Sequence, residues 1–403
     1  MSNLPQGWEV KKLGEIGEIV TGSTPSKSNL DFYGKDYPFF KPSDFEQGYF
    51  LENAGDNLSK LGFDKARQLP PKTILVVCIG SLGKVALTRV IGSCNQQINA
   101  IIPHKNIISE YIYYYCISSK FQSILFSKAP QTTLAIFNKT EFSKLEIIYP
   151  KDIKEQERIV GILDFAFSKI DENIKKAKEN LANIDELMQS ALQKAFNPLN
   201  DNTKENYQLP QSWEWKSLGD TSNYGKTSQV KPSQLKGNDW ILELEDIEKE
   251  SGVLLQKVLF QDRQSKSNKI KFNKGDILFG TLRPYLKKVI IADDNGACSS
   301  EIMPFSTGNS ITNHFIYYYL FANFLHDRIS SLTYGARMPR LGTKDGKSLQ
   351  IPLPPLQEQE QIAEHLDFVF EKAKALKELY TKELKDYEEL KQSLLDKAFK
   401  GEL

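Results

Sequence analysis

The chain has 403 residues, of which 40% are hydrophobic and 26% are charged, and its formal net charge is +1. This length allows two or three domains with cores of their own, and this composition is ordinary for a soluble globular protein. No apolar run approaches the roughly 20 residues of a membrane span, and the N-terminal MSNLPQGWEV lacks the basic-then-apolar pattern of a secretory signal. We therefore expect a cytoplasmic protein whose four cysteines, which form no CxxC pair, are free thiols.

Residues 1–150 predict a mixed α and β head. It opens with LPQGWEVKKLG at 4–14, and short β-rich runs follow at 74–79, 85–90 and 98–102. Gly, Ser and Asn break these runs, which is typical of strands in a small sheet. A helix rich in Tyr, Ile and Phe is expected at 109–127. We interpret the tyrosine triplet at 113–115 as helix packing, with a base-stacking platform as the less favoured alternative.

A long amphipathic helix is predicted at 151–196, after Pro150, because proline ends a preceding element and fits a helix entry. Apolar residues recur in steps of three and four from 159 to 195, with one phase slip between 170 and 174. Residues 197–208 (NPLNDNTKENYQ) are polar and turn-forming. They are the expected linker to the second half of the chain.

The second half repeats the first at an offset of about 204 residues, which indicates two copies of a head–helix pair. LPQSWEWKSLG at 209–219 matches eight of eleven positions of the first start. QEQEQIAEHLDFVF at 357–370 matches eight of fourteen positions of KEQERIVGILDFAF at 154–167. We expect a second head at 209–351, with strands at 277–280 and 289–292 and a helix at 313–332. A second long helix should follow at 352–403, with Gly401 as its C-terminal cap.

These elements predict an α+β fold in which two mixed α/β heads alternate with two long helices. Two apolar stripes in one chain most simply pair as a coiled coil, and the connectivity makes the pair antiparallel with a pseudo-twofold axis. About 42 residues then give a spacer of roughly 60 Å. In the alternative, each helix packs on its own head. The expected helix-pair interface comprises Leu163, Ile170, Ala177, Ile184, Ala191, Leu366, Ala373, Tyr380, Tyr387 and Leu394.

The charge is divided between heads and helices. The heads carry net charges of +3 (1–150) and +4 (207–350), whereas the helical segments carry −2 (151–206) and −4 (351–403). This division suits heads that contact a polyanion and helices that contact proteins. Two ordinary basic domains joined by solvated acidic helices would give a similar pattern.

No signature of catalysis occurs in the sequence. It has no GxGxxG after a strand and no Asn-Pro-Pro-aromatic tetrapeptide, and its four histidines are scattered. The acidic cluster at 243–246 is interpreted as a charged turn, not as a metal site. We expect no catalytic, cofactor-binding or metal-binding residues in this chain.

Three stretches together resemble the specificity subunit of a type I restriction–modification system. They are LPQGWEVKKLGEIGEIVTGSTPSK, the EQERIVGILDFAF helix, and the end PLPPLQEQEQIAEHLDFVF…LKQSLLDKAFKGEL. The resemblance covers the whole chain and implies two target recognition domains, each reading one half of a split DNA site. It also implies helices that space the heads and dock modification (methyltransferase) subunits, with restriction subunits joining. S-adenosylmethionine, ATP and magnesium are then expected on those partners and not on this chain.

DNA contacts call for cationic and hydroxyl groups toward phosphates, and for Arg, Lys, Asn, Gln or acidic groups toward base edges. Gln131 to Thr133 are considered as DNA contacts in addition to the candidates named below. For any single residue, a solvated surface role is as plausible as a contact. The candidates are Lys41, Ser43, Ser81, Lys84, Asn95, Gln96, Gln97 and Lys139 in head one, and Arg283, Lys287, Lys288, Ser299, Ser300, Glu301, Arg337 and Arg340 in head two.

Two other functions compete with DNA specificity. A structural scaffold, with two domains binding proteins across a coiled-coil spacer, would have no sequence-selective affinity for DNA. A nuclease with an unrecognised centre would show metal-dependent cleavage that is lost when Glu245 or Asp246 is changed. The charge division disfavours the scaffold, and the missing motifs disfavour the nuclease.

Overall fold

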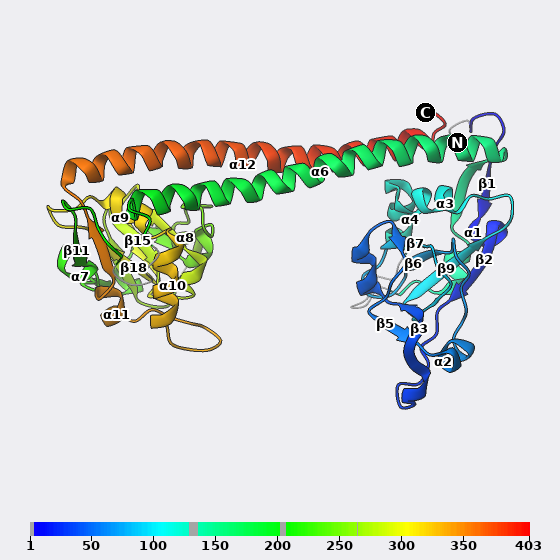
Figure 1. The fold of residues 1–403 in the computed structure, drawn as a ribbon, viewed down its shortest axis with the longest axis horizontal. Coiled ribbons are helices and arrows are strands. Elements are labelled where there is room, and N and C mark those ends of the chain that lie inside the picture. Colours follow the sequence, from blue (N-terminus) through cyan, green and yellow to red (C-terminus); the bar gives the residue numbers. More distant parts are fainter. Residues whose placement is uncertain (1–3, 129–135, 202–206, 264) are drawn as a thin grey trace. The chain divides into compact units, whose positions relative to one another are not determined.

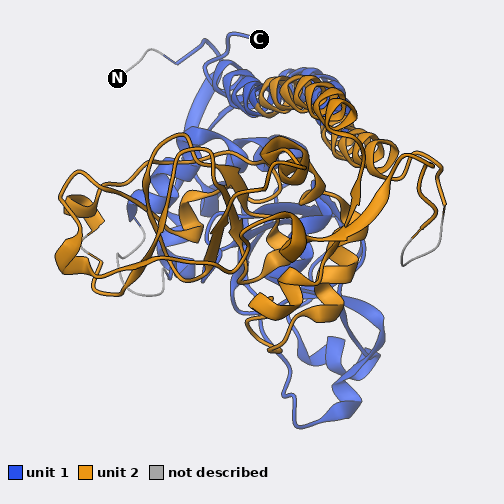
Figure 2. Ribbon diagram, turned by 90° about the vertical axis from the view of Figure 1, so that its left-hand side faces the viewer, with its two compact units in different colours: residues 1–177, 382–403 blue, residues 178–381 orange. Residues whose placement is uncertain are grey.

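The computed structural model describes residues 4–128, 136–201, 207–263 and 265–403. It divides into two compact units, which Figure 2 shows in blue and orange. Unit 1 comprises Met1–Ala177 and Lys382–Leu403, and unit 2 comprises Lys178–Thr381. Each unit therefore holds one head and one segment of each long helix. The linker predicted at 197–208 includes residues 202–206, which lie outside the described part of the chain.

The head of unit 1 is built on a five-stranded sheet (Figure 1). Its central strand, Ile74–Val77, is completely buried because apolar side chains occupy both faces. The strands predicted at 74–79, 85–90 and 98–102 are confirmed within a few residues. In spatial order the sheet comprises β2 (Gly17–Thr21), β9 (Ile98–Pro103), β6 (Ile74–Val77), β7 (Val85–Thr88) and β4 (Phe50–Leu51).

Two smaller sheets complete this head. An antiparallel pair joins its two ends, with Trp8 opposite Pro150 and Lys12 opposite Glu146. A three-stranded sheet carries a separate small core of Phe39, Leu58 and Phe63. The strands are β1 (Trp8–Lys12) with β10 (Glu146–Pro150), and β5 (Asp56–Leu58), β3 (Tyr33–Phe40) and β8 (Ser93–Cys94).

The single helix predicted at 109–127 is wrong: the structure has two helices that break at Ser118. This residue is extended (φ −67°, ψ 147°), and its hydroxyl group donates a 2.7 Å hydrogen bond to the Tyr115 carbonyl oxygen. A serine hydroxyl group that bonds a nearby backbone carbonyl oxygen competes with the helix and favours such a break. The tyrosines of the triplet pack into or against the core, as predicted. The helices of this head are α1 (Leu13–Ile16), α2 (Lys60–Lys65), α3 (Ser109–Ile117), α4 (Ser119–Lys128) and α5 (Lys139–Ser143), with 3₁₀ turns η1 (Leu30–Phe32) and η2 (Pro42–Gln47).

The head of unit 2 has the same plan with different sheets. The predicted strand at 277–280 is confirmed as β15, and that at 289–292 as β16, which ends one residue earlier. The antiparallel pair β11 (Glu214–Ser217) with β19 (Gln350–Leu353) again joins the two ends of the head. The other sheets are β12 (Gln229–Val230), β14 (Lys269–Phe272), β17 (Gly296–Cys298) and β13 (Trp240–Leu242), and β16 (Val289–Ile291), β15 (Ile277–Gly280) and β18 (Ile302–Phe305).

The helix predicted at 313–332 is likewise two helices, α9 and α10, separated by 320–322. Both pack on the second head's core, where the tyrosine triplet lies in or against the apolar cluster. The helical elements of this head are α7 (Leu218–Thr221), α8 (Phe260–Arg263), α9 (Asn313–Tyr319), α10 (Asn323–Leu332) and α11 (Thr343–Lys347), with η3 (Pro232–Gln234), η4 (Leu244–Asp246) and η5 (Pro284–Leu286).

The two long helices are α6 (Ile153–Phe196) and α12 (Leu356–Ala398). The second begins later than predicted because strand β19 runs on to Leu353. Within unit 1, Lys391 of α12 pairs with Asp171 of α6 at 2.5 Å, and within unit 2, Lys377 pairs with Asp185. Gly401 has a positive φ of 73° beyond the end of α12, as expected for a C-terminal cap.

A buried glutamine ties each head to its long helix. Gln156 accepts from the Ile108 N–H at 2.9 Å and donates to the Pro150 carbonyl oxygen at 2.9 Å. Gln359 repeats these bonds in unit 2, with Thr312 at 3.0 Å and Pro354 at 2.8 Å. Both glutamines are fully buried. A sequence motif of the repeat, Glu-Gln-Glu, is thus a joint between head and helix.

Replacing Gln156 with alanine is expected to destabilise the joint of unit 1 by roughly 1–3 kcal/mol, because buried backbone groups lose their partners. Gln359→Ala should do the same in unit 2. Hydrogen exchange resolved along the chain would show faster exchange at the altered joint alone. The exposed Gln357→Ala is the matched control, and equal exchange in all three variants would contradict the prediction.

Candidate nucleic-acid interface

A cavity of about 530 Å³ opens in the head of unit 2, where candidates predicted from the sequence meet residues that were not predicted to bind DNA. Three of the candidates, Arg283, Lys288 and Glu301, line it. Charged side chains of both signs and apolar side chains share its wall, as in binding pockets where a few polar groups on an apolar lining fix the orientation of a ligand. The lining comprises Glu243, Leu244, Glu245, Arg263, Leu282, Arg283, Leu286, Lys288, Glu301 and Met338.

The loop around η5 presents Arg283 to solvent. Arg283 (φ 49°) and Lys287 (φ 46°) flank the turn in the left-handed region, which non-glycine residues rarely adopt. The Arg283 N–H donates to the Pro339 carbonyl oxygen at 2.7 Å, so a second loop holds the strained backbone. The Arg283 side chain is exposed. Strain of this kind persists where surrounding contacts determine the conformation, and it clusters at binding loops.

Lys287 points inward. Its ammonium group donates to the Phe321 carbonyl oxygen at 3.0 Å and to the Asn323 side chain, and only 6% of the residue is exposed. Burial lowers the pKa of Lys287 below its ordinary value. Lys288 donates to the Leu244 carbonyl oxygen at 2.6 Å. These two lysines therefore anchor the loop that carries Arg283.

His326 of α10 lies near the Lys287 ammonium group. From its environment we predict that the stability of unit 2 depends on pH. Burial lowers its pKa from an ordinary 6.5 to about 4. Its Nε2 lies 2.6 Å from the Leu320 carbonyl oxygen, and its Nδ1 is buried without a hydrogen-bond partner among the described residues. Protonation of the ring is therefore favoured in the unfolded chain.

Because the folded pKa is depressed, the stability that neutral His326 contributes is complete above pH 6.5 and is lost as the pH falls toward 4. The loss should reach roughly 3 kcal/mol, at 1.36 kcal/mol for each pKa unit. Denaturant unfolding at a series of pH values would measure it. His326→Gln should flatten the profile between pH 6.5 and 4, whereas His365→Gln, on the exposed face of α12, should leave it unchanged. Identical profiles for wild type and His326→Gln would refute the assignment.

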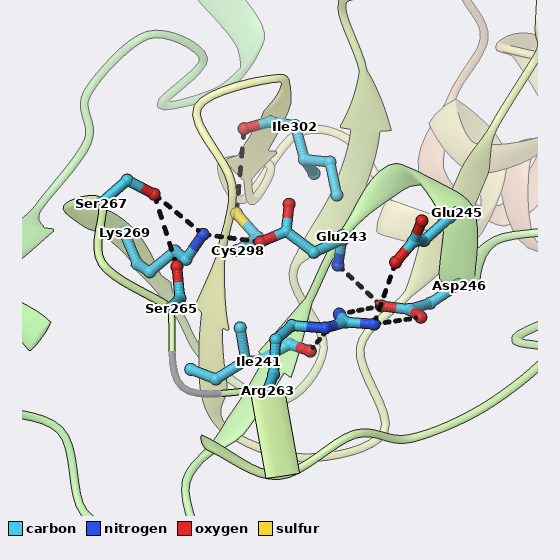
Figure 3. Close-up of polar contacts among 10 residues, drawn as sticks. All are labelled: Ile241, Glu243, Glu245, Asp246, Arg263, Ser265, Ser267, Lys269, Cys298 and Ile302. Carbon is cyan, nitrogen blue, oxygen red and sulfur yellow. Dashed lines mark hydrogen bonds and ion pairs between the residues drawn. The ribbon is translucent and has the colours of Figure 1, made fainter. Parts of the chain in front are cut away.

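The acidic side of the cavity is held by buried ion pairs, which Figure 3 shows. Asp246 is fully buried and receives two bonds from Arg263, at 2.5 and 2.9 Å, and one from the Glu243 N–H at 2.8 Å. Burial alone would raise the pKa of Asp246, but these bonds outweigh burial and hold the pKa below its ordinary value. Lys269, 2% exposed, pairs with Glu243 at 2.6 Å. The charged turn predicted at 243–246 is confirmed as η4, with internal cationic partners.

The remaining candidates of this head are dispersed. Ser299 is buried, whereas Ser300 is exposed next to Glu301 on the cavity wall. Arg337 is exposed in the loop after α10. The backbone of Arg340 bonds that of Tyr334 in both directions, at 2.9 and 3.1 Å. Only part of the set predicted for head two therefore faces a common surface.

The corresponding loop of head one lines a smaller cavity, of about 340 Å³. Lys84 lines it and forms an ion pair with Glu46, while Gln122 donates to the Gly83 carbonyl oxygen at 2.9 Å. The side chains of Lys84 and Glu46 are 40% and 76% exposed, so solvent weakens their attraction. A phosphate group can therefore compete for Lys84.

The other candidates of head one lie on several loops. Lys41 pairs with Asp56, and Gln96 accepts a hydrogen bond from Thr24. Asn95 is buried and bonds Gln97 at 2.8 Å, so it shapes the loop from within. Ser43, Ser81 and Lys139 are exposed. Gln131 to Thr133 lie outside the described residues.

The predicted helix-pair residues fall into three groups. Ile184, Ala373 and Tyr380 share one apolar cluster in unit 2, directly between the helices. Four others, Leu163, Leu394, Ala191 and Leu366, also belong to or pack against the cores that include the heads. Ile170 and Ala177 are buried, and the Tyr387 hydroxyl group donates to Glu383 at 2.6 Å. The long helices of each unit thus contact both one another and the head.

Three residues of the head-two cavity, Glu243, Glu245 and Arg263, were not predicted to contact DNA. The acidic cluster is visible in the sequence, but its partners Arg263 and Lys269 follow 17 and 26 residues after Asp246 and Glu243. No local pattern links positions at such separations. The sequence shows the acidic turn, but only the fold brings it beside the basic loop at 283–288.

Within the part of the chain that the structure describes, no three His, Cys, Asp or Glu residues gather in a way that could hold a metal ion. Among the same residues, no helix is long and apolar enough to cross a membrane. The four cysteines are all buried and free. Burial raises the pKa of Cys78 to about 12.

The sequence model of one protein family matches most of the chain. It is described as the type I restriction modification DNA specificity domain, and it matches residues 5–183 and 210–385. The two matches correspond to the two repeats.

Curated relatives match over different lengths. The HindI specificity subunit of Haemophilus influenzae is 38% identical over 42% of this chain and 38% of its own length. The MjaIX specificity subunit of Methanocaldococcus jannaschii is 28% identical over 55% of this chain and 52% of its own. These matches thus span less than two thirds of either relative. The EcoDI specificity subunit of Escherichia coli is 23% identical over 99% of this chain and 89% of its own.

Two solved structures share the fold. A chain from a structure of a type I restriction–modification system aligns over 100% of both chains, with a TM-score of 0.79 and 19% identity. The HsdS subunit of Thermoanaerobacter tengcongensis aligns over 100% of this chain and 98% of its own, with a TM-score of 0.55 and 21% identity. At these identities the likeness concerns the fold.

Proposed function

The chain belongs to the family of type I restriction–modification DNA specificity domains, and on this basis we propose that it is the DNA-reading subunit of such a complex. Each head reads one half of a bipartite site in double-stranded DNA. The observation that carries the proposal is the duplication itself: two units share one plan, and each head has a cavity of its own.

The two heads are suited to different half-sites. In head two the cavity combines carboxylates with an exposed guanidinium group, whereas in head one a lysine–glutamate pair and Gln122 line the corresponding place. Cationic side chains favour phosphates and guanine, and carboxylates favour exocyclic amino groups. Because the two cavities have different linings on the same fold, we expect the two heads to read two different short DNA sequences.

The long helices act as a spacer and pair as an antiparallel coiled coil. The Asp171–Lys391 and Asp185–Lys377 ion pairs support this assignment. Fourteen residues forward along α6 correspond to fourteen residues back along α12, so the two pairs fit one antiparallel register. With the heads at either end of a roughly 60 Å spacer, a pseudo-twofold arrangement matches the dyad of duplex DNA.

The exposed faces of the helices dock two modification subunits. Phe165 and Phe368 occupy matched positions of the two repeats and are 69% and 60% exposed. Large exposed apolar side chains at matched positions fit two copies of one partner. Restriction subunits complete the complex, and it resides in the cytoplasm.

The chain itself performs no catalysis, and S-adenosylmethionine, ATP and magnesium bind to the partner subunits. The domains we assign are recognition domains at 1–150 and 209–351, spacer segments at 151–196 and 352–403 that contain α6 and α12, and a linker at 197–208. Division of labour of this kind leaves the heads free to differ while the docking surfaces stay alike.

Single-molecule mapping of adenine methylation in the source genome tests the proposal. With the gene intact we expect a split, asymmetric motif, and with the gene deleted its methylation should disappear. Where the native partners are silent, co-expression with a matched modification subunit and a repeat of the map restores the readout. Methylation that is unaffected in both experiments would refute DNA specificity.

A further inference from the structure

In the cavity of head two, a carboxylate and a guanidinium group are available to solvent. The Glu245 side chain is 74% exposed, and its contact with Arg263 is long, at 3.4 Å. Arg283 lies exposed on the η5 loop and lines the same cavity. An acceptor and a planar donor therefore border one concave surface.

Buried charges hold this surface in place. Arg263 donates two hydrogen bonds to Asp246, and Lys269 forms an ion pair with Glu243. Cations inside the head therefore hold both ends of η4 (Figure 3). Buried ion pairs of this kind add little net stability compared with apolar packing, and they are best understood as fixing geometry. Lys287 anchors the loop of Arg283 to the Phe321 carbonyl oxygen, and Lys288 ties the end of that loop to the Leu244 carbonyl oxygen of η4. Both Glu245 and Arg283 are thus presented from rigid backbone.

The chemistry of this pair matches one base-pair edge. In the major groove, guanine offers the O6 and N7 acceptors that arginine recognises with two bonds, and its partner cytosine offers the N4 amino group that a carboxylate accepts. An A·T pair offers the thymine O4 acceptor where the G·C pair has that amino group, so it would face the carboxylate with a second acceptor.

We propose that Glu245 and Arg283 read a G·C pair in the half-site of head two, with Arg283 donating to guanine and Glu245 accepting from cytosine. This inference rests on the proposed function and specifies its substrate. Glu245 is then a residue that determines specificity, and its exposed side chain adds little to the buried ion pairs that hold η4.

The test uses the complete chain, co-produced with its modification subunit in cells whose methylated adenines are then mapped. Wild type, Glu245→Ala, Glu245→Gln and Arg283→Ala are compared, with Glu248→Gln as the matched control. Glu248 is exposed near η4 and does not line the cavity. Each good base contact discriminates by roughly 5- to 150-fold, so the loss of one should be visible as a relaxed position in the motif.

We expect both Glu245 variants to relax the same G·C position in one half-site only. Arg283→Ala should relax that position too, and the Glu248 control should retain the wild-type motif. Motifs identical to wild type in the Glu245 variants would overturn the inference, and so would uniform weakening at every site with unchanged base preference. A wild-type complex without any split motif would instead refute the proposed function, so the two failures are distinguishable.

Discussion

Replacing Asp246 with alanine is expected to lower the free energy of unfolding of unit 2 by roughly 3–5 kcal/mol. The carboxylate is fully buried and receives bonds from the Arg263 guanidinium group, the Glu243 N–H and the Gln256 side chain. Removing it leaves a mostly buried cation without its partner, since the Arg263 side chain is only 15% exposed. The guanidinium group would keep only its 3.4 Å contact with the exposed Glu245 and its bond to the Ile241 carbonyl oxygen, so much of its charge would be left uncompensated inside the head.

Denaturant unfolding monitored by tryptophan fluorescence suits this measurement, because Trp213, Trp215 and Trp240 all lie in unit 2. Asp262→Ala, at an exposed position of α8, is the matched control and should change the free energy by less than about 0.5 kcal/mol. The double variant Asp246→Ala, Arg263→Met should recover much of the loss, because it removes both charges. Equal stabilities of Asp246→Ala and the control would show that the pair is not structural.

The repeat and its long helices could be predicted because they depend on periodicity, which a sequence displays directly. The apolar stripe from 159 to 195 predicted α6, and the matched start and helix segments predicted a second head with the same plan. Strands β6 and β15 were predicted because each is a short β-branched or apolar run beside a turn residue.

The break at Ser118 could not be predicted, because the periodic pattern continues through it. At Ser118 the break coincides with a hydroxyl group that donates to the Tyr115 carbonyl oxygen, but a serine inside a helix is equally common on a solvated face, so its presence does not predict a break. In the second head the same joint occurs at 320–322 without a serine. Tertiary packing of the two short helices therefore determines the geometry.

The direction in which a lysine points is also hidden from the sequence. Lys287 and Arg283 stand four residues apart and were predicted together, yet one anchors the loop from inside and the other is exposed. The left-handed backbone at Arg283 and Lys287, on either side of η5, turns the two side chains in different directions. The carbonyl oxygen of Phe321, in the turn before α10, then binds the Lys287 ammonium group. Contacts between distant segments therefore decide which member of a basic cluster remains exposed.

Inserting four residues into each long helix is expected to widen the gap between the two half-sites by about two base pairs. Four residues lengthen a helix by roughly 6 Å, and stacked base pairs are about 3.4 Å apart. Insertions after positions 180 and 382 preserve the register that the Asp171–Lys391 and Asp185–Lys377 ion pairs share. The half-sites themselves should not change, because the heads are untouched. Methylation mapping of the co-produced complex measures the gap and both half-sites in one experiment.

An insertion in α6 alone is the informative comparison, because it lengthens one helix while shifting its apolar stripe against α12. We expect that variant to lose methylation, since Ile184 and Met188 would no longer meet Ala373. Replacing four exposed residues in each helix without changing its length should retain the wild-type gap. If the paired insertions methylate the original gap, the helices do not set the spacing, and flexible heads must find their half-sites independently. A gap that grows by two base pairs, with both half-sites unchanged, would instead identify the helix pair as the element that measures the DNA.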